Sequence, residues 1–191
     1  DASRLERNLN LVLQILQITH KVVLCLNLMD EAKRNKIFVD HRALAKRLGI
    51  PVIPTSARSG KGIPELLQAI DEVATGAYEP KPLATFTLAP EAEQALGSVT
   101  ALLAQYCPEL PNKHWLALRL IEDDPLIWHY LSSSEIGEIV PNAKTLGEEE
   151  IAKLRALTDE IRERTQGSFH ETLARAIFAK AQEIAQTVVQ F

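Results

Sequence analysis

The chain has 191 residues, of which 46% are hydrophobic and 24% are charged, and its formal net charge is −4. This composition is typical of a folded protein with one or two domains and excludes a disordered or fibrous chain. The sequence contains no run of Lys and Arg, no signal-peptide pattern and no apolar stretch near the ~20 residues that span a bilayer, so we expect a soluble piece without a nucleic-acid partner.

Helical and strand-like patterns alternate from the start of the chain. Apolar residues at helical spacing predict a first helix that ends near Thr19, on Leu5, Leu9, Val12 and Leu16. The β-branched and aliphatic run 22–26 is typical of a strand buried on both faces. Asp40 is placed to cap a second helix, which is expected to stop at Gly49 because glycine adopts positive φ at little cost.

A second strand and a third helix follow. The run 50–54 predicts a strand whose prolines, at 51 and 54, restrict it to a strand end or a sheet edge. Pro64, after the glycine-rich turn 60–62, suits the first turn of a helix. Alternation of this kind predicts parallel strands with helices packed over the sheet, and ligands of such sheets bind beyond the carboxyl ends of the strands.

The pattern changes after residue 78, where two prolines follow closely. Apart from a short extended piece expected at 85–87, the remainder has only helical spacing, and Asp124 is placed to cap one of the helices. The apolar stripe from Leu173 to Val188 is expected to be bundle core. We therefore predict two domains: an α/β part over 1–78, with a partial parallel sheet and flanking helices, and an all-α helical bundle over 79–191.

Two loops at the ends of the expected strands carry a binding pattern. Asn27-Leu-Met-Asp30 follows the first strand, and Thr55-Ser-Ala-Arg58 follows the second. The carboxylate of Asp30 can accept two hydrogen bonds, and guanine presents an N1–H and an N2 amino group side by side whereas adenine does not. Asn27 would bridge the loops, the Ala57 N–H would donate to the guanine O6, and Ser56 and Arg58 complete the predicted base-binding site.

Structural explanations of these residues stand beside the binding hypothesis. Asp30 could simply cap the turn or helix after its strand, Ser56 could stabilise only its own loop, and Arg58 could be a solvated surface charge. In the second part, the consecutive residues 122–124 with His129 nearby could suggest an iron site, because carboxylates and imidazole are suitable ferrous ligands. Three consecutive residues at a helix end point in different directions, and capping explains the last of them without a metal.

The chain resembles the ferrous iron transport protein B family, bacterial membrane proteins with an N-terminal GTP-binding domain, a helical domain and a membrane core. The resemblance rests on four stretches, 1–9, 27–30, 55–58 and 115–124, and so extends across both predicted domains. Leu28 stands where most Ras-like proteins carry lysine. Because this family commonly has an apolar residue there, the departure supports the resemblance.

A phosphate-binding loop of the G-x-x-x-x-G-K-[ST] type does not occur in the sequence. The resemblance implies that this loop, both switches and the magnesium ligands precede the position of Asp1, so that the chain holds only the base-binding half of a Ras-like domain. We expect it to bind GTP or GDP through base contacts, to need Mg²⁺ in the parent protein, and not to hydrolyse GTP alone.

The resemblance implies the guanine-nucleotide-binding cytoplasmic portion of a bacterial Fe²⁺ transporter, on the cytoplasmic face of the inner membrane. Its expected partners are guanine nucleotide, the missing N-terminal half of the GTP-binding domain and a membrane-embedded transport domain, and self-association into a homo-oligomer is kept open. Cys25 and Cys107 form no disulfide framework, which favours a reducing compartment. Two alternatives stay open: a GTPase of the ribosome-assembly type, and a non-catalytic helical interaction module.

Overall fold

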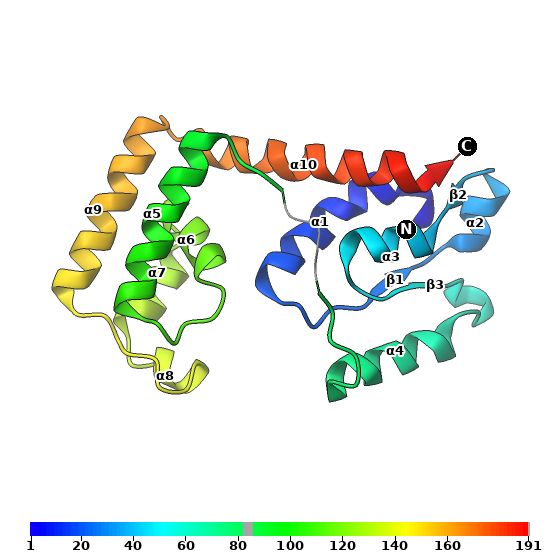
Figure 1. The fold of residues 1–191 in the computed structure, drawn as a ribbon, viewed down its shortest axis with the longest axis horizontal. Helices are drawn as coiled ribbons and strands as arrows, with labels where there is room; N and C mark the ends of the chain where they lie inside the picture. Colours follow the sequence, from blue (N-terminus) through cyan, green and yellow to red (C-terminus); the bar gives the residue numbers. More distant parts are fainter. Residues whose placement is uncertain (82–85, 191) are drawn as a thin grey trace. The chain divides into compact units, whose positions relative to one another are not determined.

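The computed structural model describes residues 1–81 and 86–190 (Figure 1). Contacts between residues group the chain into two compact units, Asp1–Phe86 with Ala176–Phe191, and Thr87–Arg175. Within the described residues, no helix combines the length and the apolar character that crossing a membrane requires. Thr85 of the expected extended piece lies outside the described residues, and Phe86 and Thr87 belong to no strand.

The first unit is an α/β structure. Strands β1 and β3 pair in parallel, with Leu24 beside Val52 and Leu26 beside Pro54, as the intervening helices require. Its elements in chain order are the 3₁₀ helix Ala2–Arg4, α1 (Leu5–Ile18), β1 (Leu24–Leu26), α2 (Met29–Arg34), β2 (Phe38–Val39), α3 (His41–Leu48), β3 (Val52–Pro54), the 3₁₀ helix Ala57–Ser59, α4 (Ile63–Thr75), the later part of α10 (Phe169–Val188) and β4 (Val189–Gln190).

The ends of α1 and α3 agree with the sequence. α1 ends at Ile18, next to the expected stop at Thr19. The carboxylate of Asp40 accepts hydrogen bonds from the backbone N–H groups of Arg42 (3.0 Å) and Ala43 (2.9 Å), and α3 ends at Gly49, whose φ is 73°. The caps predicted at both ends of α3 are therefore confirmed.

The expectation that β1 is buried on both faces is wrong. Leu26 is buried, but the neighbouring Cys25 is exposed. Successive side chains of a strand point to opposite faces of the sheet, so only one face of β1 is covered in the part of the chain that the structure describes. Within that part β1 pairs with β3 alone.

The second unit is a helical bundle, as predicted. α5 packs against α6 and α9, and α7 lies against α6 and α9. Its elements are α5 (Pro90–Tyr106), α6 (Lys113–Ile121), α7 (Pro125–Ser132), α8 (Ile136–Ile139), α9 (Glu148–Arg164) and the start of α10. Its core consists of buried apolar side chains from these helices, including Leu96, Val99, Leu103, Leu120, Leu131, Leu154 and Ile161.

The last helix differs from its expected role. Ile177, Ala181 and Ile184 are buried as the apolar stripe requires, but from Ala176 onward the chain packs with the first unit. β4 pairs antiparallel with β2, and the Asp40 N–H donates to the Val188 carbonyl oxygen at 2.9 Å. This part of the stripe is therefore core of the α/β unit. The domain limits inferred from the sequence, 1–78 and 79–191, stay a prediction.

The start of α9 carries a pH-dependent cap. Hydrogen bonding to the Lys144 ammonium (2.9 Å), and then to the Gly147 N–H (2.9 Å), holds the pKa of Glu150 below its ordinary value of 4.5. A carboxyl with a lowered folded-state pKa contributes stability above its unfolded-state pKa and loses it as the pH falls through the folded-state pKa.

We therefore expect the Glu150 cap to be intact at neutral pH and to release only below pH 4.5. The backbone amide shift of Gly147 in an NMR titration should report the release, because its N–H loses a charged acceptor. In Glu150→Gln this step should vanish while the rest of the spectrum is kept. A step at or above the ordinary glutamate pKa would contradict the prediction.

Candidate functional site

The two predicted loops meet at the carboxyl end of the parallel sheet. β1 leads into residues 27–30 and β3 leads into residues 55–58. The Thr55 N–H donates to the Leu26 carbonyl oxygen at 2.8 Å, and the Met29 N–H donates to the Thr55 carbonyl oxygen at 3.2 Å. These bonds extend the strand pairing into the loops and hold the two loops side by side.

Asn27 bridges the loops through its side chain. Its Oδ1 accepts from the Ala57 N–H at 3.1 Å and from the Thr55 hydroxyl at 3.2 Å. Thr55 is only 1% exposed, and its Oγ1 also lies 3.2 Å from the Cys25 Sγ. Sequence reasoning did not assign Thr55 to the site, although a hydroxyl at the start of the second loop was the available signal.

The Ala57 N–H has a different partner from the predicted one. The sequence predicts that it donates to the guanine O6, and in this structure it donates to Asn27 instead. Ala57 itself is exposed. Its contact with the base stays a prediction.

Ser56 and Asp30 connect the loops a second time. The Ser56 Oγ accepts from the Asp30 N–H at 3.2 Å, and Ser56 is buried. The Asp30 carboxylate is 49% exposed, and its nearest cation is Arg34 at 3.9 Å. Leu28, with φ 62°, occupies the N-cap position of α2 and its own side chain makes no capping bond, so Ser56 supplies a side-chain acceptor for the first turn of this helix. Asp30 therefore does not serve as the cap, and its carboxylate is available to a ligand.

Arg58 and the turn after it complete the second loop. Arg58 is exposed in the short 3₁₀ helix. The Ser56 N–H donates to the Lys61 carbonyl oxygen at 3.0 Å, which closes the turn. Gly62 has φ 80°, and a Cβ added there would lie 2.2 Å from the Pro54 carbonyl oxygen. The turn therefore requires glycine at 62, a constraint that sequence reasoning did not identify.

The acidic residues 122–124 do not converge on a metal. Glu122 is nine-tenths buried, forms an ion pair with Arg119, and lies 2.6 Å from the Nδ1 of His170. Asp124 caps α7 by accepting from the Leu126 N–H at 3.0 Å. The described residues contain no group of three side chains arranged to hold a metal ion. Glu122 and Asp124 thus have separate partners in this structure.

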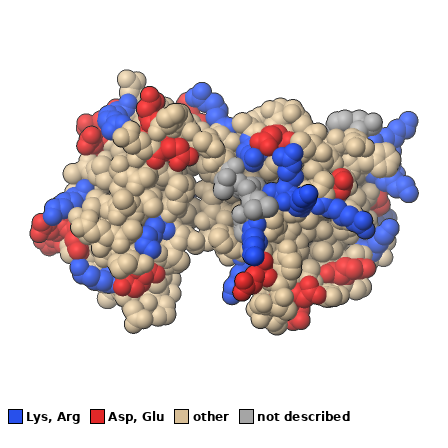
Figure 2. Space-filling view, in the orientation of Figure 1, with Lys and Arg blue, Asp and Glu red and all other residues tan. Residues whose placement is uncertain are grey.

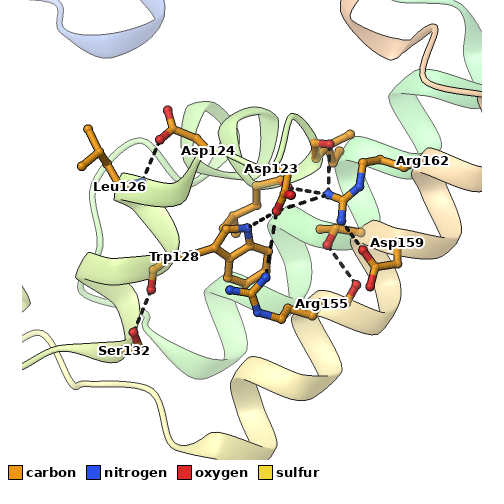
Figure 3. A network of polar contacts seen from close by, with 11 residues as sticks. Asp123, Asp124, Leu126, Trp128, Ser132, Arg155, Asp159 and Arg162 are labelled. Carbon is orange, nitrogen blue, oxygen red and sulfur yellow. Dashed lines mark hydrogen bonds and ion pairs between the residues drawn. The ribbon is translucent and has the colours of Figure 1, made fainter.

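Asp123 instead belongs to a polar network around Trp128, in which four side chains point toward one another (Figure 3). Its Oδ1 accepts from the buried Trp128 indole N–H at 2.9 Å and lies 4.0 Å from Arg155 and 3.9 Å from Arg162. The Arg155 guanidinium lies 4.3 Å from the centre of the Trp128 ring. This network joins α7 to α9, and Trp128, only 4% exposed, anchors the core of the bundle.

We expect Asp123→Ala to destabilise the second unit by about 2 kcal/mol, because it leaves the buried indole N–H without an acceptor. Urea unfolding followed by tryptophan fluorescence measures this directly, since both tryptophans lie in the second unit. Asp123→Asn is the matched control, because it keeps an oxygen acceptor and tolerates the positive φ of 58° at this position. Equal losses in both variants would show that the charge, and not the bond to Trp128, matters.

A partial parallel sheet with two connected loops at its carboxyl end, together with a helical bundle, is the architecture of a fragment of a Ras-like domain with an appended helical domain. Residues 1–70 match the family model for ferrous iron transport protein B, and residues 89–190 match that for the FeoB cytosolic helical domain. The chain belongs to the FeoB family.

Individual FeoB proteins are similar in sequence to this chain. The Fe(2+) transporter FeoB of Salmonella choleraesuis (strain SC-B67) is 35% identical over 145 residues, which are 76% of this chain and 18% of the relative. The Fe(2+) transporter FeoB of Escherichia coli (strain K12) is 36% identical over 126 residues, which are 65% of this chain and 15% of the relative. The match thus spans less than a fifth of the length of these curated relatives.

Solved structures share the fold. The cytosolic domain of L. pneumophila FeoB has a TM-score of 0.71 and 28% identity, and the match covers 100% of this chain and 66% of that one. A mutant S. thermophilus NFeoB bound to GDP has a TM-score of 0.74 at 20% identity and covers 100% of this chain and 67% of that one. The second likeness concerns the fold alone.

Proposed function

We propose that this chain is part of the cytoplasmic, guanine-nucleotide-binding portion of a bacterial ferrous iron transporter. The observation that carries the proposal is the pair of bridges, Asn27 to Ala57 and Asp30 to Ser56, that hold two loops together at the carboxyl end of the sheet. Ligands of parallel sheets bind at this edge. The S. thermophilus NFeoB mutant that shares this fold is bound to GDP, which supports a guanine nucleotide as the ligand.

Each predicted residue has a proposed role. The exposed carboxylate of Asp30 accepts from the guanine N1–H and N2 amino group. Asn27 keeps the loops together beneath the base, and Ser56 orients Asp30 through the backbone bond. The Ala57 N–H donates to O6, and Arg58 borders the base from the exposed turn. Adenine offers an acceptor where Asp30 needs a donor, so this arrangement selects guanine.

Hydrolysis needs groups that these residues do not supply. Phosphoryl transfer depends on positioned phosphates and a bound Mg²⁺, and the chain has no phosphate-loop motif. In the proposed parent protein, a preceding half-domain holds the phosphates and Mg²⁺, and GTP binding and hydrolysis regulate or drive Fe²⁺ uptake through a membrane-embedded domain. The portion described here would lie on the cytoplasmic face of the inner membrane, and a homo-oligomer is compatible with the proposal.

The test is equilibrium binding of fluorescent GDP and ADP to a chain extended at its N-terminus with the phosphate-binding half of the family. GDP should bind and ADP should not. Binding of both nucleotides with equal affinity would refute the assignment of Asp30. Binding of neither would refute the nucleotide site and would favour a non-catalytic interaction module as the function.

A further inference from the structure

One surface of the first unit is strongly basic. The segment 29–49, through α2, β2 and α3, carries six Lys or Arg residues against three Asp or Glu residues, although the whole chain has a net charge of −4. Figure 2 shows Lys and Arg side chains over the region of α3 and outward toward α2, whereas Asp and Glu gather along α4. The six residues, which we call the basic face, are all exposed: Lys33, Arg34, Lys36, Arg42, Lys46 and Arg47.

Few of these charges are neutralised by neighbours. Arg34 lies 3.9 Å from Asp30, and Arg47 lies 3.2 Å from Glu183. The other four members of the basic face have no ion-pair partner within residues 1–81 and 86–190. The carboxylate of Asp40, in the middle of the segment, caps α3 and still counts against the positive charge. Glu31 is exposed in the same segment. The six cations of the basic face therefore exceed the four nearby carboxylates, those of Asp30, Glu31, Asp40 and Glu183, by two, and this net positive charge attracts an anionic partner.

The basic face cannot be recognised in the sequence. Its basic residues occur singly or in pairs, separated by a buried strand residue and by the α3 core positions, so no linear run of charge appears. The fold turns Val39, Leu44 and Leu48 inward and leaves the Lys and Arg side chains outside. Phe38, between the two basic groups, remains 59% exposed.

We propose that the basic face binds the anionic headgroups of a membrane leaflet, so that the first unit lies on the lipid surface. A flat leaflet meets one face only, whereas a nucleic acid that contacts several faces would also meet the acidic α4. The exposed Phe38 adds an apolar side chain among the basic ones, a combination that also occurs in segments that lie at a membrane interface. The proposal rests on the proposed function in that the cytoplasmic portion of a transporter lies within reach of a leaflet.

The test is co-sedimentation of the chain with vesicles of phosphatidylcholine alone and with added phosphatidylglycerol. We expect binding only to the anionic vesicles, and weaker binding at higher salt because the charges are exposed. Each Lys or Arg near an anionic surface strengthens partitioning roughly fivefold. The double variant Arg42→Ala with Lys46→Ala should therefore partition roughly 30-fold less strongly.

A matched control removes the same charge elsewhere. Arg164 and Arg175 are exposed arginines of α9 and α10 outside the first unit, and their double alanine variant should keep vesicle binding. Arg42→Lys with Lys46→Arg should keep it as well. Circular dichroism of each variant shows whether its fold is retained.

Three outcomes would overturn the proposal. They are equal binding to neutral vesicles, an equal loss in the Arg164 and Arg175 control, and tighter binding to single-stranded nucleic acid than to anionic vesicles at the same salt. Nucleotide binding by the extended chain is a separate readout. Its failure while vesicle binding persists would refute the guanine site alone, and the reverse result would refute the basic face alone.

Discussion

Asp30→Asn should lower the affinity of the N-terminally extended chain for GDP roughly 100-fold or more. The exposed carboxylate would accept two hydrogen bonds from guanine, and bonds to a charged group contribute about 1.5 to 3 kcal/mol each. The amide removes the charge and places a donor against the guanine N2 amino group. Equilibrium titration with fluorescent GDP measures the loss.

The same substitution should improve binding of xanthosine diphosphate, because xanthine carries a carbonyl oxygen where guanine carries the N2 amino group. The introduced amide can donate to that oxygen and still accept from N1–H. This exchange of preference separates a direct contact from a folding defect, since a misfolded loop would bind neither nucleotide. Unchanged GDP affinity would show that Asp30 does not contact the base.

Gly62→Ala should destabilise the first unit by about 3 kcal/mol, because it combines two costs. The φ of 80° disfavours any side chain, and the new Cβ would lie 2.2 Å from the Pro54 carbonyl oxygen and 3.2 Å from the Thr55 Cα. Relief of the clash requires movement of the loop that positions Asn27. Amide hydrogen exchange in β3 and α4 measures the loss of stability.

Gly60→Ala is the matched control. Gly60 has a similar φ of 73°, but an added Cβ would meet no atom within 4 Å. Gly60→Ala should therefore destabilise the first unit only through the unfavourable positive φ, by about 1 kcal/mol. If the two variants were equally destabilised, the close approach of Gly62 to Pro54 would not matter for stability.

Much of the local structure could be predicted from the sequence. Helical spacing indicated α1 and the helical character of the second part, and Asp40 and Asp124 were identified as caps. The short elements α2, β2 and α8 were missed, because two to six residues are too few to establish a period. The two loops of the candidate site were found because each follows an apolar strand and carries side chains suited to guanine.

The hydrogen-bond partners and close contacts of individual residues could not be predicted from the sequence. Sequence spacing shows that Asn27 and Ala57 follow neighbouring strands. Only the folded loops show that the Ala57 N–H donates to the Asn27 side chain. The approach of Gly62 to Pro54 and the separate partners of residues 122–124 likewise depend on atoms brought together by folding.

The sequence by itself determined the fold class, the guanine-type motif and the family, because periodicity, caps and short motifs are properties of neighbouring residues. The tertiary structure decided where the apolar stripe of α10 is buried, since an apolar helix face can pack equally well on a sheet or on a bundle. Pairing of β4 with β2 and the bond from Asp40 to Val188 place the later part of α10 on the α/β unit. The same folding gathers scattered Lys and Arg residues into the basic face, because burial of the apolar positions leaves the charged ones outside.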